Sequence, residues 1–522
     1  YSKAEPLYLR ALAIREKVLG PEHKYTTESL NNLASLYNKQ GQYSKAEPLF
    51  QRALAIRENV LGADHPSTAN ALNNLALLYD KQGLYRKAES LYLRALAIKE
   101  KVLGAEHPGT AISLNNLASL YQDQGLYSKA EPLYKRALAI KEKVLGAEHP
   151  GTAISLNNLA SLYQDQGLYS KAEPLYKRAL AIKEKVLGAE QQDIAISLEK
   201  LGFLYSLQGL YKTAEPLFKR VLSIREKALG AEHRDTATTL NYLANLYKKQ
   251  GLYSKAEHLH QRALAIKKKT LGLEHSSTAN ALNYLALLYN DQGLYGKAES
   301  LALSALAIRE KVLGAEHPNV GNSLSTLAVI YRAQQLYNKA EPLFVRALAI
   351  DENTHGNDHY EVAISLNNLA LMYSEQGLYI EAEPLHRRAL AIKEKVFGAE
   401  HPSIATSFNN LAYVYRMQGL YNKAEPLYKN ALAINQKSLG AEHPDTANLL
   451  KQLSYIYYDQ GLLNRAGPLT RRALAIEFTL IQRQAPYLAL SDRQSFVNKL
   501  GNAYEIAFSS AARGDSGAEL AM

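Results

Sequence analysis

Apolar residues recur along this chain at the spacing of one helix face. In one representative stretch they fall at positions i, i+3, i+4 and i+7, namely at Leu114, Leu117, Ala118 and Tyr121. This spacing predicts a helix over about residues 110–124, which we call the A helix. Pro108 suits a helix entrance, because the missing N–H needs no partner there. Gly125 follows the helix and accepts a positive φ at low cost, so we expect it to end the helix.

A second helix, the B helix, is predicted directly after the A helix. The run Ser128-Lys129-Ala130-Glu131 reads as a capping box at its start. That reading places Pro132 just inside the helix, where its missing N–H costs little. The stripe expected to be buried comprises Ala130, Leu133, Ala137, Ile140 and Val144. Small residues in this stripe allow the two helices to pack closely as an antiparallel hairpin.

The whole hairpin is one copy of a 42-residue repeat. The segment Arg94–Glu148 recurs letter for letter as Arg136–Glu190, and looser copies fill nearly all of the 522 residues. Repeats of this length stack into one continuous array of helices. We expect an unpaired B helix over residues 2–19, then eleven hairpins, so that the array spans residues 1–484. Gln335 replaces the glycine that ends the other A helices, and predicts an altered turn.

The C-terminal segment departs from the 42-residue phase. Ala485-Pro486 breaks the last helix, and Ser491-Asp492-Arg493-Gln494 opens another. We interpret residues 485–522 as a capping helix followed by a truncated linker toward an absent C-terminal domain. Tyr1 aligns with the middle of a repeat, and the chain is expected to be part of a longer protein.

The repeat resembles the tetratricopeptide repeat in the pattern Leu117-Ala118-x-x-Tyr121 followed by Ala130-x-x-x-Tyr134-x-x-Ala137. The common unit of that family has 34 residues. The 42-residue form is similar to the repeats of kinesin light chains and of many bacterial proteins. The resemblance implies an all-α, right-handed solenoid superhelix of antiparallel hairpins. It also implies that the A helices line a concave surface where peptides bind, with the B helices outside.

The tail carries a second resemblance. Residues of about 480–522 are similar to the segment that joins such arrays to a caspase-like CHAT domain in bacterial, especially cyanobacterial, proteins. This resemblance implies that the array is the sensor arm of a protease whose catalytic Cys and His lie elsewhere.

The composition favours a non-catalytic, cytoplasmic protein. The net charge is +11, but the repeat itself carries five cations against four anions, so about eleven repeats account for the excess. We interpret these cations, Lys141 among them, as a solvated helix face rather than a nucleic-acid track. The chain has no Cys, and no apolar run long enough for a membrane span. We expect no cofactor and no catalytic residues.

Histidines also recur with the repeat, but a metal site is not expected. Each lies in the loop before a different A helix, and stacked repeats are separated by about a helix diameter, on the order of 10 Å. A zinc ligand lies about 2 Å from its metal. We therefore interpret these residues as structural. They are His23, His65, His107, His149, His233, His275, His317, His359, His401 and His443.

The predicted binding site is the face of the A helix opposite its apolar stripe, where Ile112, Asn116, Ser119 and Asp123 lie. Asn can donate and accept at once, so a column of Asn can bond the backbone of an extended peptide. The alternative is that these Asn bond to each other or to neighbouring turns. The predicted groove residues are Asn32, Asn74, Asn116, Asn158, Lys200, Tyr242, Tyr284, Asn368 and Asn410.

Three of these residues, Lys200, Tyr242 and Tyr284, interrupt the Asn column and are predicted anchors for a partner, since Tyr is common among interface hot spots. Drift among repeats explains them equally simply. The function expected overall is a scaffold that binds protein or peptide segments along the groove. Two alternatives stay open, namely the protease sensor arm and a module that self-associates end to end through its bare first B helix.

Overall fold

The computed structural model describes residues 4–40, 42–188 and 191–484. Over these residues the chain forms 23 α-helices and no strand. The first, α1 (Glu5–Leu19), is a B helix, and A and B helices alternate after it. The A helices are α2 (Lys24–Lys39), α4 (Pro66–Lys81), α6 (Pro108–Asp123), α8 (Pro150–Asp165), α10 (Gln192–Leu207), α12 (Arg234–Lys249), α14 (Ser276–Asp291), α16 (Pro318–Ala333), α18 (Tyr360–Glu375), α20 (Pro402–Met417) and α22 (Pro444–Asp459). The B helices are α3 (Tyr43–Leu61), α5 (Tyr85–Leu103), α7 (Tyr127–Leu145), α9 (Tyr169–Leu187), α11 (Tyr211–Leu229), α13 (Tyr253–Leu271), α15 (Tyr295–Leu313), α17 (Tyr337–His355), α19 (Tyr379–Phe397), α21 (Tyr421–Ser438) and α23 (Leu463–Gln484).

The loop histidines cap the A helices. His107 precedes α6 with extended backbone, and its Nδ1 accepts a hydrogen bond from the backbone N–H of Gly109 over 3.0 Å. This bond satisfies one of the N–H groups that a helix start leaves without a partner. The same cap recurs at every loop histidine of the array, which confirms that these residues are structural. The predicted capping helix at 485–522 lies outside the described residues.

The A helix ends as predicted at Gly125, which has a φ of 71°. The N–H of Leu126 reaches back to the carbonyl oxygen of Tyr121 over 2.7 Å and satisfies an end carbonyl. The prediction of an altered turn at Gln335 is wrong. Gln335 adopts a φ of 59°, and the N–H of Leu336 still donates to the Tyr331 carbonyl over 2.9 Å. A side chain therefore occupies a left-handed position there without changing the hairpin.

The predicted capping box of the B helix is also wrong. Helix α7 begins at Tyr127, and no side chain caps it. The carbonyl of Leu126 accepts the N–H groups of Lys129 and Ala130 instead, over 3.0 and 3.1 Å. Ser128 is consequently the second helical residue, and Pro132 lies inside the helix rather than at its start.

The buried faces agree largely with the apolar stripes. Leu114, Leu117 and Tyr121 of α6 are buried, and the small Ala130 and Ala137 of α7 are fully buried where the helices cross. Val144, predicted to lie in the same stripe, is exposed instead. It is at the far end of α7, beyond the part of the B helix that the A helices cover.

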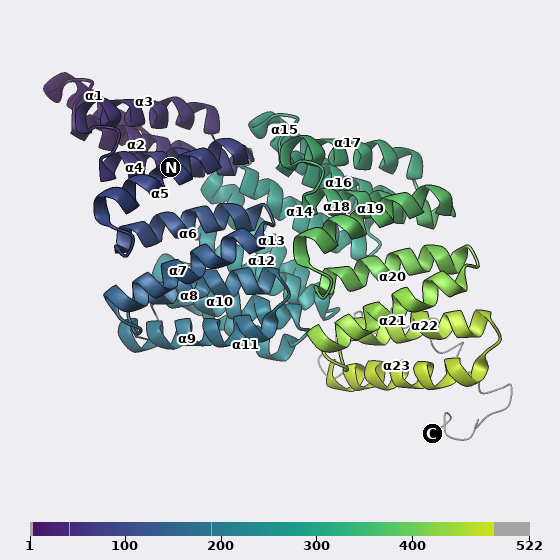
Figure 1. The fold of residues 1–522 in the computed structure, drawn as a ribbon. Coiled ribbons are helices and arrows are strands. Elements are labelled where there is room, and N and C mark those ends of the chain that lie inside the picture. The colour runs from purple at the N-terminus through teal and green to yellow at the C-terminus, as the bar shows by residue number, and fades with distance from the viewer. Residues whose placement is uncertain (1–3, 41, 189–190, 485–522) are drawn as a thin grey trace.

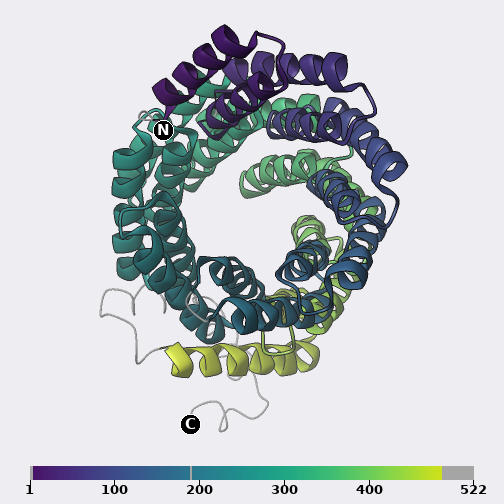
Figure 2. The ribbon, with the colours of Figure 1, turned by 90° about the vertical axis from the view of Figure 1, so that its left-hand side faces the viewer.

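The hairpins curve into a ring around a central axis (Figure 2). Consecutive A helices approach closely enough for short side chains to meet, as when Asn157 Nδ2 donates to Ser197 Oγ over 2.8 Å. Consecutive B helices meet instead through long charged side chains, such as Arg136 and Glu100, 2.7 Å apart. The A helices therefore form the inner wall of the ring and the B helices its outer layer.

The array is long enough for its second superhelical turn to contact the first (Figure 1). His359 Nε2 lies 3.2 Å from the carbonyl oxygen of Asp123, and His401 Nε2 lies 2.9 Å from that of Asp165. Both pairs are 236 residues apart. The end of α6 thus meets the start of α18, so each repeat contacts the sixth repeat after it.

One part of the charge interpretation needs correction. Arg136 and Lys143 are on the outer surface and are paired with Glu100 and Glu106, as expected of a solvated face. The column that contains Lys141 is instead largely buried between hairpins. Its members bond to the first turn of the next A helix, as Lys183 Nζ does to the Asp193 carbonyl over 3.0 Å. The buried members of this column are Lys99, Lys183, Arg225, Lys267, Arg309, Asp351, Lys393 and Asn435.

Within the described residues, no helix has the length and apolar character needed to cross a membrane.

Candidate binding surface on the concave wall

The A helices present one face to the centre of the ring, and that face was predicted from the helical wheel. On α6, Ile112, Ser119 and Asp123 are exposed. Asn116, predicted to lie among them, is only partly exposed. The Asn column therefore lies at the margin of the concave wall, between neighbouring A helices, rather than along its centre.

The predicted groove residues follow this placement along the array. Asn32 is exposed, and the other eight are half-buried, namely Asn74, Asn116, Asn158, Lys200, Tyr242, Tyr284, Asn368 and Asn410. Two of them bond within the array. Asn410 Nδ2 donates to Asn367 Oδ1 over 2.9 Å, and Lys200 Nζ donates to Ser161 Oγ over 3.4 Å. For these two positions, the amide or ammonium group already has a partner on the neighbouring A helix.

A different column of Asn side chains, which we call the amide ladder, joins neighbouring A helices. It lies one residue before the predicted Asn column in each A helix. Asn73, Asn157 and Asn283 each donate from Nδ2 to a Ser hydroxyl 40 residues on, over 3.3, 2.8 and 3.2 Å. Their partners are Ser113, Ser197 and Ser323. The sequence contained a signal for this ladder, because the Asn and Ser columns recur with the same period. These bonds hold the inner wall together and are not directed at a ligand.

The two predicted tyrosine anchors are partly used for packing. The ring of Tyr242 lies edge-on to that of Phe203, with centroids 4.4 Å apart, and Tyr284 stacks on His260 at 5.9 Å. Burial, followed by the nearby charge of Glu199, raises the pKa of Tyr242 above its ordinary value. Each ring is therefore partly engaged in packing, Tyr242 against the neighbouring A helix α10 and Tyr284 against the B helix α13.

The helical wheel placed Ile112 on this wall, and the structure shows that it belongs to a row of exposed isoleucines that was not recognised as a row. Ile112, Ile154 and Ile196 occupy one position in three consecutive A helices, and between 48% and 53% of each is exposed. Ile364 continues the column in the second superhelical turn. The signal lay in the printed sequence, because Ile recurs at the position four residues before the Asn of the groove.

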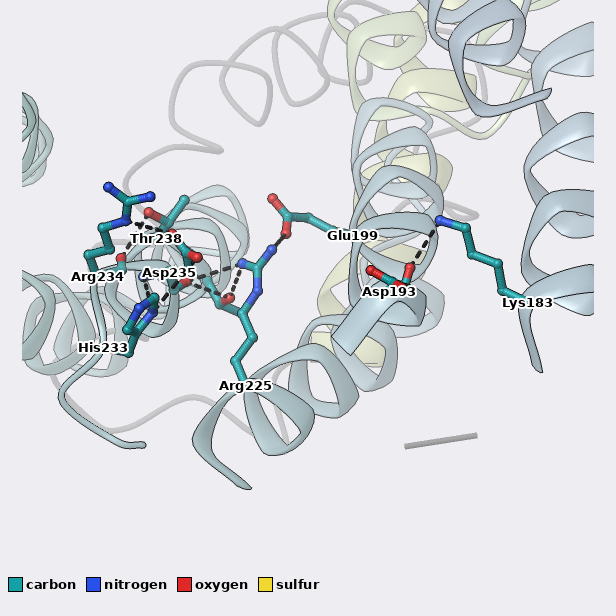
Figure 3. A network of polar contacts seen from close by, with 9 residues as sticks. Lys183, Asp193, Glu199, Arg225, His233, Arg234, Asp235 and Thr238 are labelled. Carbon is teal, nitrogen blue, oxygen red and sulfur yellow. Dashed lines mark hydrogen bonds and ion pairs between the residues drawn. The ribbon is translucent and has the colours of Figure 1, made fainter. Parts of the chain in front are cut away.

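The most divergent repeat contains a buried polar network (Figure 3). Glu199 of α10 replaces the ladder Asn, and its Oε2 is paired with Arg225 Nη2 of α11 at 2.6 Å. Arg225 Nη1 also donates to Thr239 Oγ1 over 2.6 Å and to the Asp235 carbonyl over 3.2 Å. Burial raises the pKa of Glu199, and the charge of Arg225 opposes that effect. This network links three successive helices and leaves Glu199 directed at the array rather than at a ligand.

One well-defined cavity is not on the concave wall. A cleft of about 1600 Å³ opens between the two superhelical turns, where Gln40 and Tyr43 face Lys269, His275 and His317. Its lining mixes both charge signs with apolar atoms. Within the described residues, no three His, Asp or Glu side chains are grouped so that they could hold a metal ion.

A superhelix of antiparallel helix hairpins, with a concave wall that carries exposed polar and apolar side chains, defines an α-solenoid repeat protein. The chain belongs to the tetratricopeptide repeat family, whose sequence profile matches most of its length. The matches cover residues 1–59, 25–101, 81–143, 109–185, 193–269, 277–353, 321–395, 361–429 and 403–476. Arrays of this family generally act as scaffolds for protein–protein interaction and are typically not enzymes. No sequence among the curated proteins matches this chain.

Several solved structures are similar to parts of the chain. One is the crystal structure of a Podosopora anserina putative kinesin light chain with nearly identical TPR-like repeats, at 31% identity over 40% of this chain and 97% of that one, with a TM-score of 0.35. BtubC from P. vanneervenii matches at 24% identity over 45% and 91%, with a TM-score of 0.37. A Rap protein complexed with Competence and Sporulation Factor matches at 15% identity over 80% and 99%, with a TM-score of 0.46.

Proposed function

We propose that the protein is a non-catalytic scaffold that binds an extended segment of a partner protein along the concave wall. The observation that carries this proposal is the exposed row of Ile112, Ile154 and Ile196 beside the half-exposed Asn116 and Asn158. Exposed apolar side chains in a contiguous row are typical of partner-binding surfaces. Their removal from water on binding favours association by roughly 25 cal/mol for each Å² buried.

The arrangement supports a peptide ligand of mixed character. The isoleucines offer apolar contacts at intervals of one repeat. The Asn side chains between them can donate to, and accept from, a peptide backbone without selecting its side chains. Because α6 and α8 have identical sequences, this part of the wall presents the same surface twice and favours a partner with a repeated or simple sequence.

A nucleic-acid ligand is disfavoured by the charge distribution. The outer cations that could contact phosphates are paired with carboxylates of neighbouring repeats, as Arg136 is with Glu100 and Lys143 with Glu106. Binding a phosphate backbone would require these pairs to open, and an exposed ion pair is worth only about 0–1 kcal/mol. The cations are therefore available in principle, but they form no track without intervening acids.

The proposal can be tested with a displayed library of random peptides. Peptides selected on the full chain should bind the double variant I112S/I154S at least tenfold more weakly. The matched control is K143S/K185S, which removes two exposed cations from the outer face of the same two hairpins. Equal affinity of the selected peptides for the wild type and I112S/I154S would contradict the proposal.

The role of sensor arm for a CHAT-type protease stays a prediction, as does end-to-end association through α1. The tail that motivated the former is outside the described residues. For the latter, Leu7 and Ile14 of α1 are exposed side chains that would form the contact.

A further inference from the structure

The array has two rims of different chemistry. The helices run along the superhelix axis, so every turn from an A to a B helix lies at one rim and every loop from a B to an A helix lies at the other (Figures 1 and 2). We call these the turn rim and the loop rim. Within one chain, the turn rim of the first superhelical turn contacts the loop rim of the second.

This contact recurs at each step, between the turn after an A helix of the first superhelical turn and the loop before an A helix of the second. The ends of α2, α4, α6, α8 and α10 face the starts of α14, α16, α18, α20 and α22. At α6 a Cβ on Gly125 would lie 2.7 Å from Val396 Cγ1, and at α10 a Cβ on Gly209 would lie 2.8 Å from His443 Cδ2. Aromatic pairs reinforce it, since Tyr127 and Phe397 have centroids 5.7 Å apart. The two rims are therefore complementary surfaces.

Two parts of the rims are covered by none of the described residues. They are the loop rim of the first superhelical turn and the turn rim of the second. On the loop rim of the first superhelical turn, the valine column equivalent to Val396 is between 48% and 72% exposed, at Val18, Val60, Val102, Val144 and Val186. The side chain of His233 there is 35% exposed, against 8% for His443 in the covered second turn.

The turn rim of the second superhelical turn is open in the same way. Among the described residues, no atom would lie within 4 Å of a Cβ on Gly293, Gly377, Gly419 or Gly461. The surfaces that fit each other inside the chain are thus each present a second time, uncovered by any of the described residues.

We infer that a second copy of this chain occupies the free loop rim, placing its own free turn rim against it. The contact would continue the one already formed within the chain. Five turns of one copy can face five loops of the next copy. The turns are those after α14, α16, α18, α20 and α22, and the loops are those before α2, α4, α6, α8 and α10. The two superhelical turns of one chain also meet at five such junctions. Of the five loops, four contain a capping histidine, at His23, His65, His107 and His149.

The geometry of the cap leaves Nε2 of each of these histidines free to donate a hydrogen bond to a carbonyl oxygen of the next copy. Nδ1 is fixed by the backbone N–H two residues on, as at His107 and Gly109. This bond orients the ring so that Nε2 can donate outward, as His359 does to the carbonyl of Asp123. The acceptors are carbonyls at the C-terminus of an A helix, which have no partner within that helix. Because the two rims differ, the interface is heterologous and does not close, and it generates an open stack of copies along the superhelix axis.

The inference is tested by sedimentation velocity and negative-stain microscopy of the full chain over a range of concentrations. The wild type should form rods whose sedimentation coefficient rises with concentration. The loop-rim variant V60K/V102K/V144K, which alters only exposed side chains, should lose that dependence and sediment as a monomer. The matched control L93K/L303K/V345K places the same charges on exposed positions in the middle of B helices, away from both rims, and should assemble like the wild type.

A mixing experiment then separates rim pairing from any other association. The loop-rim variant keeps an intact turn rim, so a small amount of it should occupy the loop rim at the end of a wild-type rod and shorten the rods. The double-rim variant V60K/V102K/V144K/I380K/M417K should not shorten them. A wild type that is monomeric at every concentration would overturn the inference, as would a loop-rim variant that assembles like the wild type.

Discussion

Tyr121 of one repeat donates its hydroxyl to Glu89 Oε1 of the preceding repeat over 2.8 Å. The tyrosine is in an A helix and the glutamate in the B helix before it, 32 residues earlier. The same bond recurs along the array, for example from Tyr163 to Glu131 and from Tyr205 to Glu173. Burial, with the bond to the Glu89 carboxylate second, raises the pKa of Tyr121 to about 12. Each bond joins one hairpin to the next.

We therefore expect Tyr121→Phe to destabilise the array, because the Glu89 carboxylate loses a partner while the packing of the ring is kept. A bond to a charged group contributes about 1.5–3 kcal/mol, and partial exposure of Glu89 places the loss near the lower end. Urea denaturation should show a lower midpoint for Y121F and a further decrease for Y121F/Y163F. The control is Y25F, at an exposed ring, which should leave the midpoint unchanged. An unchanged midpoint for Y121F would mean that the hydroxyl bond contributes nothing.

The contact between superhelical turns predicts a difference between two chemically identical substitutions. Gly167 and Gly419 have similar φ values, 69° and 74°, so Ala at either position costs about 1–2 kcal/mol through left-handed strain. Only at Gly167 would the new Cβ also collide with the ring of Pro402 in the second turn. G167A should therefore be the less stable variant. Small-angle scattering should show an expanded superhelix for G167A and a native one for G419A. Identical scattering of the two variants would argue against the inter-turn contact in solution.

A pH dependence follows from the covered histidines. Burial is the main cause that lowers the pKa of His401 to about 4, and the charge of Lys393 acts in the same direction. The unfolded chain then binds a proton that the folded chain does not between pH 6.5 and about 4. The contribution of His401 is thus complete above pH 6.5 and is lost as the pH falls through that window. Protonation also removes the lone pair with which Nδ1 caps α20.

Buried carboxyl groups act in the opposite direction, as Asp80 and Asp351 illustrate. Burial raises the pKa of both Asp80 and Asp351 to about 6, so the folded chain binds protons there that the unfolded chain does not. The acid profile of the whole protein is therefore a sum of opposing effects, and the informative measurement is a difference. H401N keeps a capping side chain but cannot titrate, and it should lose less stability than the wild type between pH 7 and pH 5. Equal loss of stability in H401N and the wild type over this range would contradict the role assigned to His401.

The ion pair of the divergent repeat predicts a coupled pair of substitutions. Several other repeats have Asn in place of Glu199 together with Lys in place of Arg225, as at Asn157 and Lys183. E199N leaves the buried Arg225 without its carboxylate, and removing one member of a buried pair costs about 3–5 kcal/mol. The double variant E199N/R225K restores the common arrangement, in which the new Asn can donate to Thr239. The double-mutant cycle should give a coupling energy above about 1 kcal/mol. Additive effects would contradict this interpretation of Figure 3.

The repeat pattern predicted most of the local structure because local structure depends on residues close in sequence. The faces of α6, the turn at Gly125 and the structural role of the histidines follow from spacing and side-chain chemistry. The capping box at Ser128 failed for a physical reason. The Schellman-type turn after α6 fixes the position of Leu126. The carbonyl of Leu126 then accepts the first hydrogen bonds of α7, so the helix begins before Ser128.

The candidate site was predicted less well. The binding site itself stays a prediction. The helical wheel placed Ile112, Ser119 and Asp123 on the exposed face of α6, but the Asn116 column proved to be at the margin of the wall. That Ile112 belongs to a row of exposed isoleucines was not recognised. The contact between Asp123 and His359 was beyond prediction from sequence. It depends on the pitch of the superhelix, which accumulates from small rotations between hairpins, and no residue pattern specifies such a rotation.

The spacing of six repeats between contacting hairpins has a consequence for how such a gene can change. Two repeats contact each other across the superhelical turns because they are six repeats apart, and not because either one has features that other repeats lack. Insertion or deletion of one whole repeat would shift every histidine to a new partner of the same type, and both rims would match again. The length of the array can therefore vary through duplication or loss of repeats, such as the identical stretch shared by residues 94–148 and 136–190, without redesign of the surfaces that hold its turns together.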